Sequence, residues 1–169
     1  MPRRRSSTLM MARVQRPRLT FDGRRQIQQR IDEITDVRLP ELRPLLAERE
    51  RDERDVAAFE RLLAESMELQ ALLDNSDVLP AVDPQNFDGT LALGMRALIT
   101  VVDGTSAWVR PVHPGEAHLD DERISLDSPL AAAILGAHVG DTITIPAPRN
   151  PWVCEILEID PRPAVSEPS

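Results

Sequence analysis

The chain of 169 residues contains no lysine and no tyrosine, and it has a single cysteine, Cys154. With one cysteine, neither an intramolecular disulfide nor a thiolate zinc site can form. No segment approaches the roughly 20 apolar residues that cross a bilayer, and the first seven residues lack the apolar core of a secretory signal. We therefore expect a cytoplasmic protein without membrane contact, in which Cys154 is a buried structural residue.

Because lysine is absent, arginine supplies all 20 basic residues, and these are unevenly distributed. Residues 1–18 hold six arginines and no acid, whereas the whole chain has a net charge of −8. This pattern predicts a basic, disordered tail on an acidic body. An acidic body argues against a classical duplex DNA binder, whose affinity comes largely from neutralising phosphates.

The first half of the chain has a helical pattern, with no glycine between Gly23 and Gly89. Thr20 and Asp22 are candidate caps of its first helix. The spacing predicts two antiparallel arms that share one apolar seam, and Pro40 and Pro44 should kink the first arm without ending it. The predicted seam residues are Ile27, Ile31, Ile34, Leu42, Leu45, Val56, Phe59, Leu63, Leu69 and Leu72.

Eight charged residues in succession, from Glu48 to Asp55, lie between the two arms. If the arms are equally long, the turn falls near residues 46–52, so the charged run forms the tip of the hairpin. A tip without any apolar anchor must face solvent. The alternative interpretation is a solvated turn without a further role.

The second half of the chain alternates short strand patterns with turn residues. Ser128 is a candidate N-cap followed by Pro129 at the first helical position, and Gly136 can end the helix in a left-handed conformation. A curved sheet packed by the single helix Pro129–Leu135 is therefore expected. Its predicted strands are Leu98–Val102, Trp108–Val112, Ile124–Leu126, Thr142–Ile145 and Val153–Ile159.

Four segments resemble the Gre transcript-cleavage factors of bacterial RNA polymerase. Leu19-Thr-Phe-Asp-Gly23 is similar to the family's opening Leu-Thr-x-x-Gly, and Leu39-Pro-Glu-Leu42 is similar to its mid-helix Arg-Pro-Glu-Ile. The strand–helix–turn–strand segment Ile124–Ile145 matches most continuously, and Trp152–Ile159 resembles the family's final strand.

The resemblance implies an α+β fold with an N-terminal antiparallel coiled-coil hairpin, called the finger below, and an FKBP-like C-terminal domain. That domain is expected to be a curved antiparallel sheet with one short helix. The implied boundaries are a basic tail at 1–18, the finger at 19–75, a linker at 76–90, the polymerase-binding domain at 91–160 and a tail at 161–169. We expect a monomer.

The resemblance also implies a function and a set of site residues. The factor would bind bacterial RNA polymerase at the rim of its secondary channel through Asp127, Ser128 and Pro129. The tip would then approach the active site and the RNA 3′ end, where Asp52 and Asp55, or less favourably Glu50 and Glu53, would help to hold Mg²⁺. The protein would have no cofactor of its own and would not be an enzyme, but would stimulate the polymerase's hydrolysis of backtracked RNA.

Two observations favour weaker cleavage than the family pattern implies. Arg51 and Arg54 alternate with the tip acids, and the interval from Pro40 to Leu73 is shorter than in the family by about one helical turn per arm. The alternatives are an inhibitor that occupies the channel without cleavage, a coiled-coil adaptor, or an FKBP-like interaction module. A metal site in the loop of His113, Glu116, His118 and Asp120 is possible by residue type, but a solvated loop is expected there.

Overall fold

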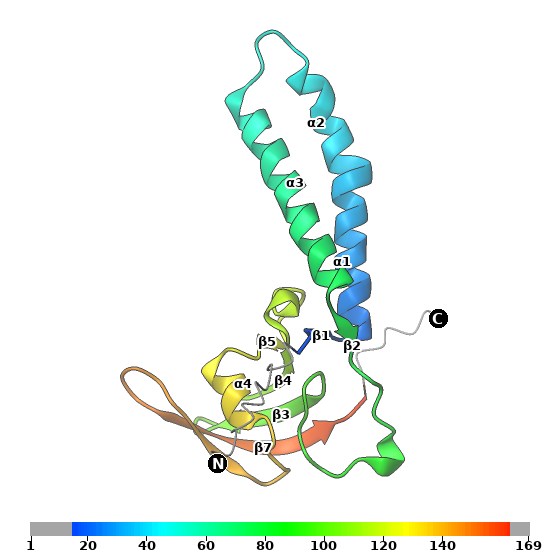
Figure 1. Cartoon of the computed structure of the whole chain (residues 1–169). Helices are drawn as coiled ribbons and strands as arrows, with labels where there is room; N and C mark the ends of the chain where they lie inside the picture. Colours follow the sequence, from blue (N-terminus) through cyan, green and yellow to red (C-terminus); the bar gives the residue numbers. More distant parts are fainter. Residues whose placement is uncertain (1–14, 163–169) are drawn as a thin grey trace, which may run out of the picture.

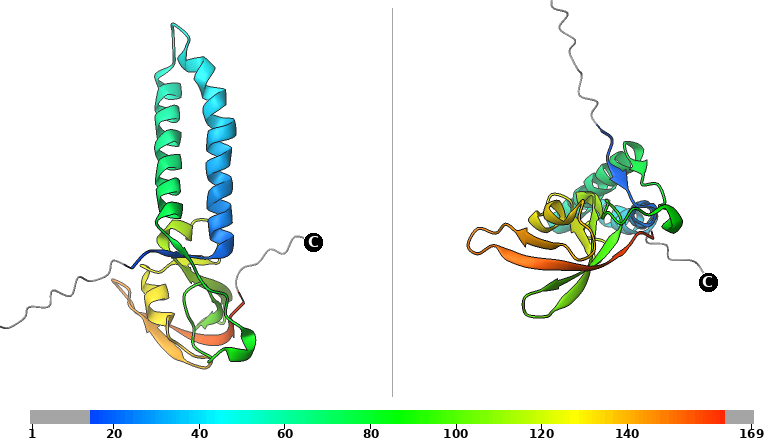
Figure 2. Two further views of the ribbon diagram at one scale, coloured as in Figure 1. Left: turned by 45° about the vertical axis from the view of Figure 1, so that its right-hand side comes forward. Right: turned by 90° about the horizontal axis from the view of Figure 1, so that it is seen from below.

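The structure is a computed structural model, and it describes residues 15–162. A helical hairpin projects from a second domain built on a curved sheet (Figure 1; Figure 2 gives two further views). The finger comprises α1 (Phe21–Glu33), the π-helical turn η1 (Ile34–Arg38), α2 (Leu39–Leu46) and α3 (Glu53–Asp74). The chain around and beyond it forms β1 (Arg18–Leu19), β2 (Asp77–Val78), η2 (Pro84–Asn86), β3 (Arg96–Val101), β4 (Ser106–Val112), η3 (Pro114–Glu116), β5 (Arg123–Ser125), α4 (Pro129–Ile134), β6 (Thr142–Ile145) and β7 (Trp152–Asp160).

The first arm of the finger begins where the sequence predicts, because the Thr20 side chain accepts a hydrogen bond from the backbone N–H of Gly23. The arm continues without a break through Pro40, as expected, but it does so by means of the π-helical turn η1. In that turn the N–H of Leu39 reaches the carbonyl of Ile34, five residues back. The turn inserts one extra residue just before the proline.

The π-helical turn changes which side chains form the seam. From Ile27 to Leu46, the buried or half-buried apolar side chains of the first arm are spaced four, three, five, three and four residues apart. Leu45 and Leu63, two predicted seam residues, are 39% and 41% exposed and lie outside it. The observed seam is Ile27, Ile31, Ile34, Leu39, Leu42 and Leu46 against Val56, Phe59, Leu62, Ser66, Leu69, Leu72 and Leu73.

The second domain is a five-stranded sheet in the order β5-β4-β3-β7-β6. The prediction of a fully antiparallel sheet is wrong, because β4 and β5 are parallel and the sheet is mixed. The connection 113–122 is long enough to carry the chain back along β4, which a tight hairpin turn cannot do. The core of this domain includes Ala97, Ile99, Val109, Ala137, Ile145, Cys154 and Ile156, with Ile134 of α4 packed among them.

The short helix α4 and the buried cysteine follow the sequence predictions. Ser128 accepts a hydrogen bond from the N–H of Ala131, Pro129 occupies the first turn, and Gly136 has a φ of 87°. Cys154 is buried, which raises the pKa of its thiol. Among the described residues, no helix is long and apolar enough to cross a membrane.

The chain segments before and after the finger pair with each other at its base. Strand β1, which precedes α1, pairs in parallel with β2, which follows α3. Arg16 also donates hydrogen bonds to the backbone carbonyls of Asp74 and Asn75. These contacts place Arg16 and Arg18 at the base of the finger, although the sequence pattern assigned them to the basic tail. The rest of that predicted tail, residues 1–14, and the last residues, 163–169, lie outside the described residues.

Candidate functional site

The charged run forms the exposed end of the finger, where the chain passes from α2 to α3 (Figure 1). Asp52 is the N-cap of α3, and its carboxylate accepts a hydrogen bond of 2.8 Å from the backbone N–H of Arg54. Asp55 lies in the first turn of the same helix, where a negative charge is favoured by the helix dipole. Both carboxylates therefore also stabilise the start of α3.

The candidate tip acids are accessible. Glu50, Asp52 and Glu53 are exposed, Asp55 is half-buried, and the arginines at 51 and 54 are exposed as well. Within residues 15–162, no group of three or more histidine, cysteine or acidic side chains is arranged to hold a metal ion. The tip can therefore present carboxylate oxygens to a cation held elsewhere, but these residues do not form a cation cage of their own.

The candidate docking residues lie on the other domain, in the turn between β5 and α4. The turn is held by the N–H of Ser128, which donates to the carbonyl of Ser125 at 2.8 Å, and by the N–H of Asp127, which donates to the Ser125 hydroxyl at 3.2 Å. Ser128 is occupied as the helix cap, whereas the side chains of Asp127 and Pro129 are exposed. The turn thus presents an acid and a proline on a rigid support.

The structure does not bring the two sets of site residues together. The tip acids lie at the far end of the finger, and the 127–129 turn lies beside α4 on the sheet domain (Figure 1). The helix α3 alone has 22 residues and is about 33 Å long at 1.5 Å per residue. Any joint action of the two sites therefore needs a partner that spans the whole molecule.

The loop that contains the four possible metal ligands does not gather them. His113 accepts a hydrogen bond from the N–H of Gly115, and burial lowers the pKa of its imidazole. Asp120 pairs with Arg123. Glu116 is completely buried and accepts hydrogen bonds from Thr20, so the expectation of a solvated loop is wrong at this residue. The carboxylate of Glu116 therefore forms a contact between the sheet domain and the finger.

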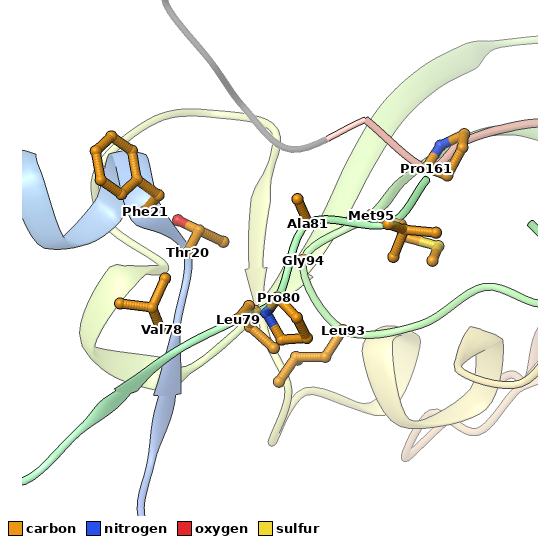
Figure 3. Close-up of a pocket in the computed structure, with 11 residues that line it drawn as sticks. Thr20, Phe21, Val78, Leu79, Pro80, Ala81, Leu93, Gly94, Met95 and Pro161 are labelled. Carbon is orange, nitrogen blue, oxygen red and sulfur yellow. The ribbon is translucent and has the colours of Figure 1, made fainter. Parts of the chain in front are cut away.

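An apolar pocket of about 300 Å³ lies at the base of the finger (Figure 3). Its walls come from the first turn of α1, from the chain after β2, and from the segment that enters β3. It is separate from both the tip and the docking turn. The lining residues are Thr20, Phe21, Val78, Leu79, Pro80, Ala81, Val82, Leu93, Gly94, Met95 and Pro161.

A projecting helical hairpin with carboxylates at its tip, carried on a sheet domain with an exposed rigid turn, defines a two-part protein suited to reaching into a partner. Residues 88–161 match the family described as the C-terminal domain of the transcription elongation factors GreA and GreB. The sheet domain of this chain is thus similar to the C-terminal domain of the Gre factors.

GreA factors of other bacteria match this chain over most of its length or over about half of it. GreA of Thermotoga neapolitana is 29% identical over 155 residues, which span 86% of this chain and 97% of the relative. GreA of Paracoccus denitrificans is 35% identical over 95 residues, which span 54% of this chain and 58% of the relative. Among solved structures, GreA factor homolog 1 of Thermus thermophilus is 23% identical, over 86% of this chain and 99% of that one, with a TM-score of 0.38.

Proposed function

We propose that this protein binds bacterial RNA polymerase and regulates transcript elongation by placing its finger tip near the active site, through the secondary channel. The observation that carries the proposal is the separation of exposed carboxylates from an exposed docking turn by the full length of the finger (Figure 1). The sheet domain, which matches the C-terminal domain of the GreA/GreB factors, would remain on the polymerase surface. An FKBP-like arrangement of that domain is part of the same proposal.

At the polymerase active site, Asp52 and Asp55 would supply carboxylate oxygens to a second Mg²⁺. Such an ion stabilises the attacking and leaving oxygens when backtracked RNA is hydrolysed. The hydrolysis would remain the polymerase's own, with the tip supplying carboxylates to its active site. Glu50 and Glu53 are exposed beside them and are the second choice for this role.

The test removes the two charges while keeping a side-chain cap at the start of α3. Asp52→Asn with Asp55→Asn keeps a good N-cap at position 52, since asparagine caps about as well as aspartate. We expect the double variant to bind polymerase as tightly as the wild type and to lose stimulated RNA cleavage in stalled elongation complexes. Glu60→Gln with Glu68→Gln is the matched control, because both acids are exposed on α3 away from the tip.

One observation favours inhibition over cleavage as a second function. Asp52 already caps α3 through the Arg54 N–H, and exposed arginines flank it, so its carboxylate is less available to a cation. In that case the wild type slows RNA synthesis, and the inhibition relaxes as Mg²⁺ is raised. Strong cleavage that depends on Asp52, without inhibition, would exclude this second function. If the wild type neither stimulates RNA cleavage nor inhibits RNA synthesis, both proposed functions are excluded.

A further inference from the structure

We propose that Glu116 is a positioning residue: from the sheet domain it holds the first turn of α1 and so determines the direction in which the finger points. The inference concerns the joint between the domains, and its functional part rests on the proposed function. The side chain comes from η3, whereas its partner Thr20 lies 96 residues earlier in the chain.

The carboxylate of Glu116 is completely buried against the start of α1. Its Oε1 accepts a hydrogen bond of 2.5 Å from the Thr20 hydroxyl, and its Oε2 accepts one of 3.1 Å from the Thr20 backbone N–H. Burial raises the pKa of this carboxyl, and the two contacts with Thr20 oppose that rise. A buried carboxyl without partners is strongly unfavourable, so the sheet domain and the finger must stay in contact here.

Gly23 shows how closely the domains approach. A Cβ built at this position would lie 1.4 Å from Oε1 of Glu116, so a larger residue fits only if the Glu116 carboxylate leaves its place or the two domains move apart. Thr20 links Gly23 to Glu116: its hydroxyl donates a hydrogen bond to Glu116 and accepts one of 2.9 Å from the N–H of Gly23. The helix cap and the domain contact therefore share one side chain.

A second buried contact prevents rotation about the first. Asp22 and Arg123 form an ion pair of 3.0 Å, with side-chain exposures of 9% and 1%. Arg123 also donates to Asp120 of its own domain. Two attachment points on the first turn of α1 constrain the tilt and the rotation of the finger, which a single contact would not do.

The length of the finger amplifies any change at its base. The first arm, from Phe21 to Leu46, is about 40 Å long, so a tilt of about 10° at the joint moves the tip by about 7 Å. Reactions that depend on positioned groups respond to displacements of about 1 Å. Glu116 would thus influence the chemistry at the tip without touching it.

The experiment measures the direction of the finger in the full chain. Spin labels are placed on cysteines introduced at the exposed positions Glu50 and Val102, with Cys154→Ala to avoid a third label, and the distance distribution is recorded. We expect one narrow distribution for the wild type, and a shift or broadening of several Å for Glu116→Ala and for Gly23→Ala. Glu116→Gln retains an oxygen acceptor for Thr20 and should stay close to the wild type.

One control variant and one substitute test variant complete the experiment. Glu158→Gln changes an exposed acid of the same domain and should leave the distribution unchanged. Thr20→Val keeps the side-chain volume, removes the hydroxyl from the joint, and replaces Gly23→Ala if that variant does not fold. Unchanged distributions in Glu116→Ala and in Gly23→Ala or Thr20→Val, with the helical circular dichroism of the wild type, would overturn the proposal.

A second readout links the joint to the proposed function. At saturating factor, Glu116→Ala should keep its polymerase affinity within about twofold and lose at least about tenfold in cleavage or inhibition. A merely destabilised protein would lose both together. If the wild type has no effect on transcription, the proposed function fails while the distance measurement still decides the role of Glu116. If the wild type is active and Glu116→Ala is equally active, Glu116 does not position the finger for this function.

Discussion

At the residue scale, Asp160 provides a pH-dependent test of how the sheet domain is stabilised. Its side chain, 9% exposed, is held by hydrogen bonds from Arg162 and Arg96, which lower its pKa to about 2 from an ordinary 3.8. A lowered pKa contributes stability that is present above pH 3.8 and disappears as the pH falls toward 2. Asp160→Asn should therefore reduce the free energy of unfolding by at most about 2 kcal/mol at pH 7.

The measurement is urea unfolding of the wild type and Asp160→Asn at several pH values between 7 and 2. The difference between them should be constant down to about pH 4 and should then narrow. Glu158→Gln, a change at an exposed neighbour, serves as the control. A difference that persists unchanged at pH 2 would mean that the carboxylate charge is not its source.

Glu116 shows what sequence patterns cannot reveal about single residues. The cap at Thr20 was predictable, because capping is a local interaction between neighbours in the chain. The contact of Thr20 with Glu116 joins residues 96 positions apart, so no local pattern encodes it. The only available signal was Gly23, a glycine in the first turn of a helix, where it is unfavourable unless another group needs the space.

At the element scale, the π-helical turn explains why the seam residues of α2 were predicted incorrectly. The strands were predicted to within about two residues, because alternation and turn residues act locally. The seam of α2 was predicted by continuing a regular spacing from Ile34, which gives Leu45, whereas the inserted residue gives Leu39 and Leu46. Leu62 and Leu63 are adjacent leucines, and only the partner arm decides which is buried.

This account of the π-helical turn predicts the effect of a deletion. Removing Val37, which is 47% exposed, together with Pro40→Ala should restore regular helical spacing and keep Leu39, Leu42 and Leu46 in the seam. The free energy of unfolding should then stay within about 1 kcal/mol of that of Pro40→Ala alone. Removing the proline matters because its ring clashes with a regular helix.

Deleting Gln29 in the same background is the matched control, since that residue is also exposed on the first arm. Its removal shortens the spacing between Ile27 and Ile31 from four to three and turns part of the seam away from α3. We expect a loss of at least about 2 kcal/mol, comparable to removing a core side chain. Equal losses in both deletions, measured by urea unfolding, would contradict the role given to the π-helical turn.

At the scale of the whole molecule, the separation of tip and docking turn makes the two functions separable by mutation. Asp127→Arg changes an exposed side chain while Ser128 continues to cap α4, so the fold should be preserved. We expect at least about a tenfold loss of affinity for core polymerase, because a reversed charge at a contact suppresses association. Asp121→Arg makes the same change at another exposed acid of the sheet domain and should bind normally. Binding of Asp127→Arg that equals that of Asp121→Arg would place the polymerase contact elsewhere on the molecule.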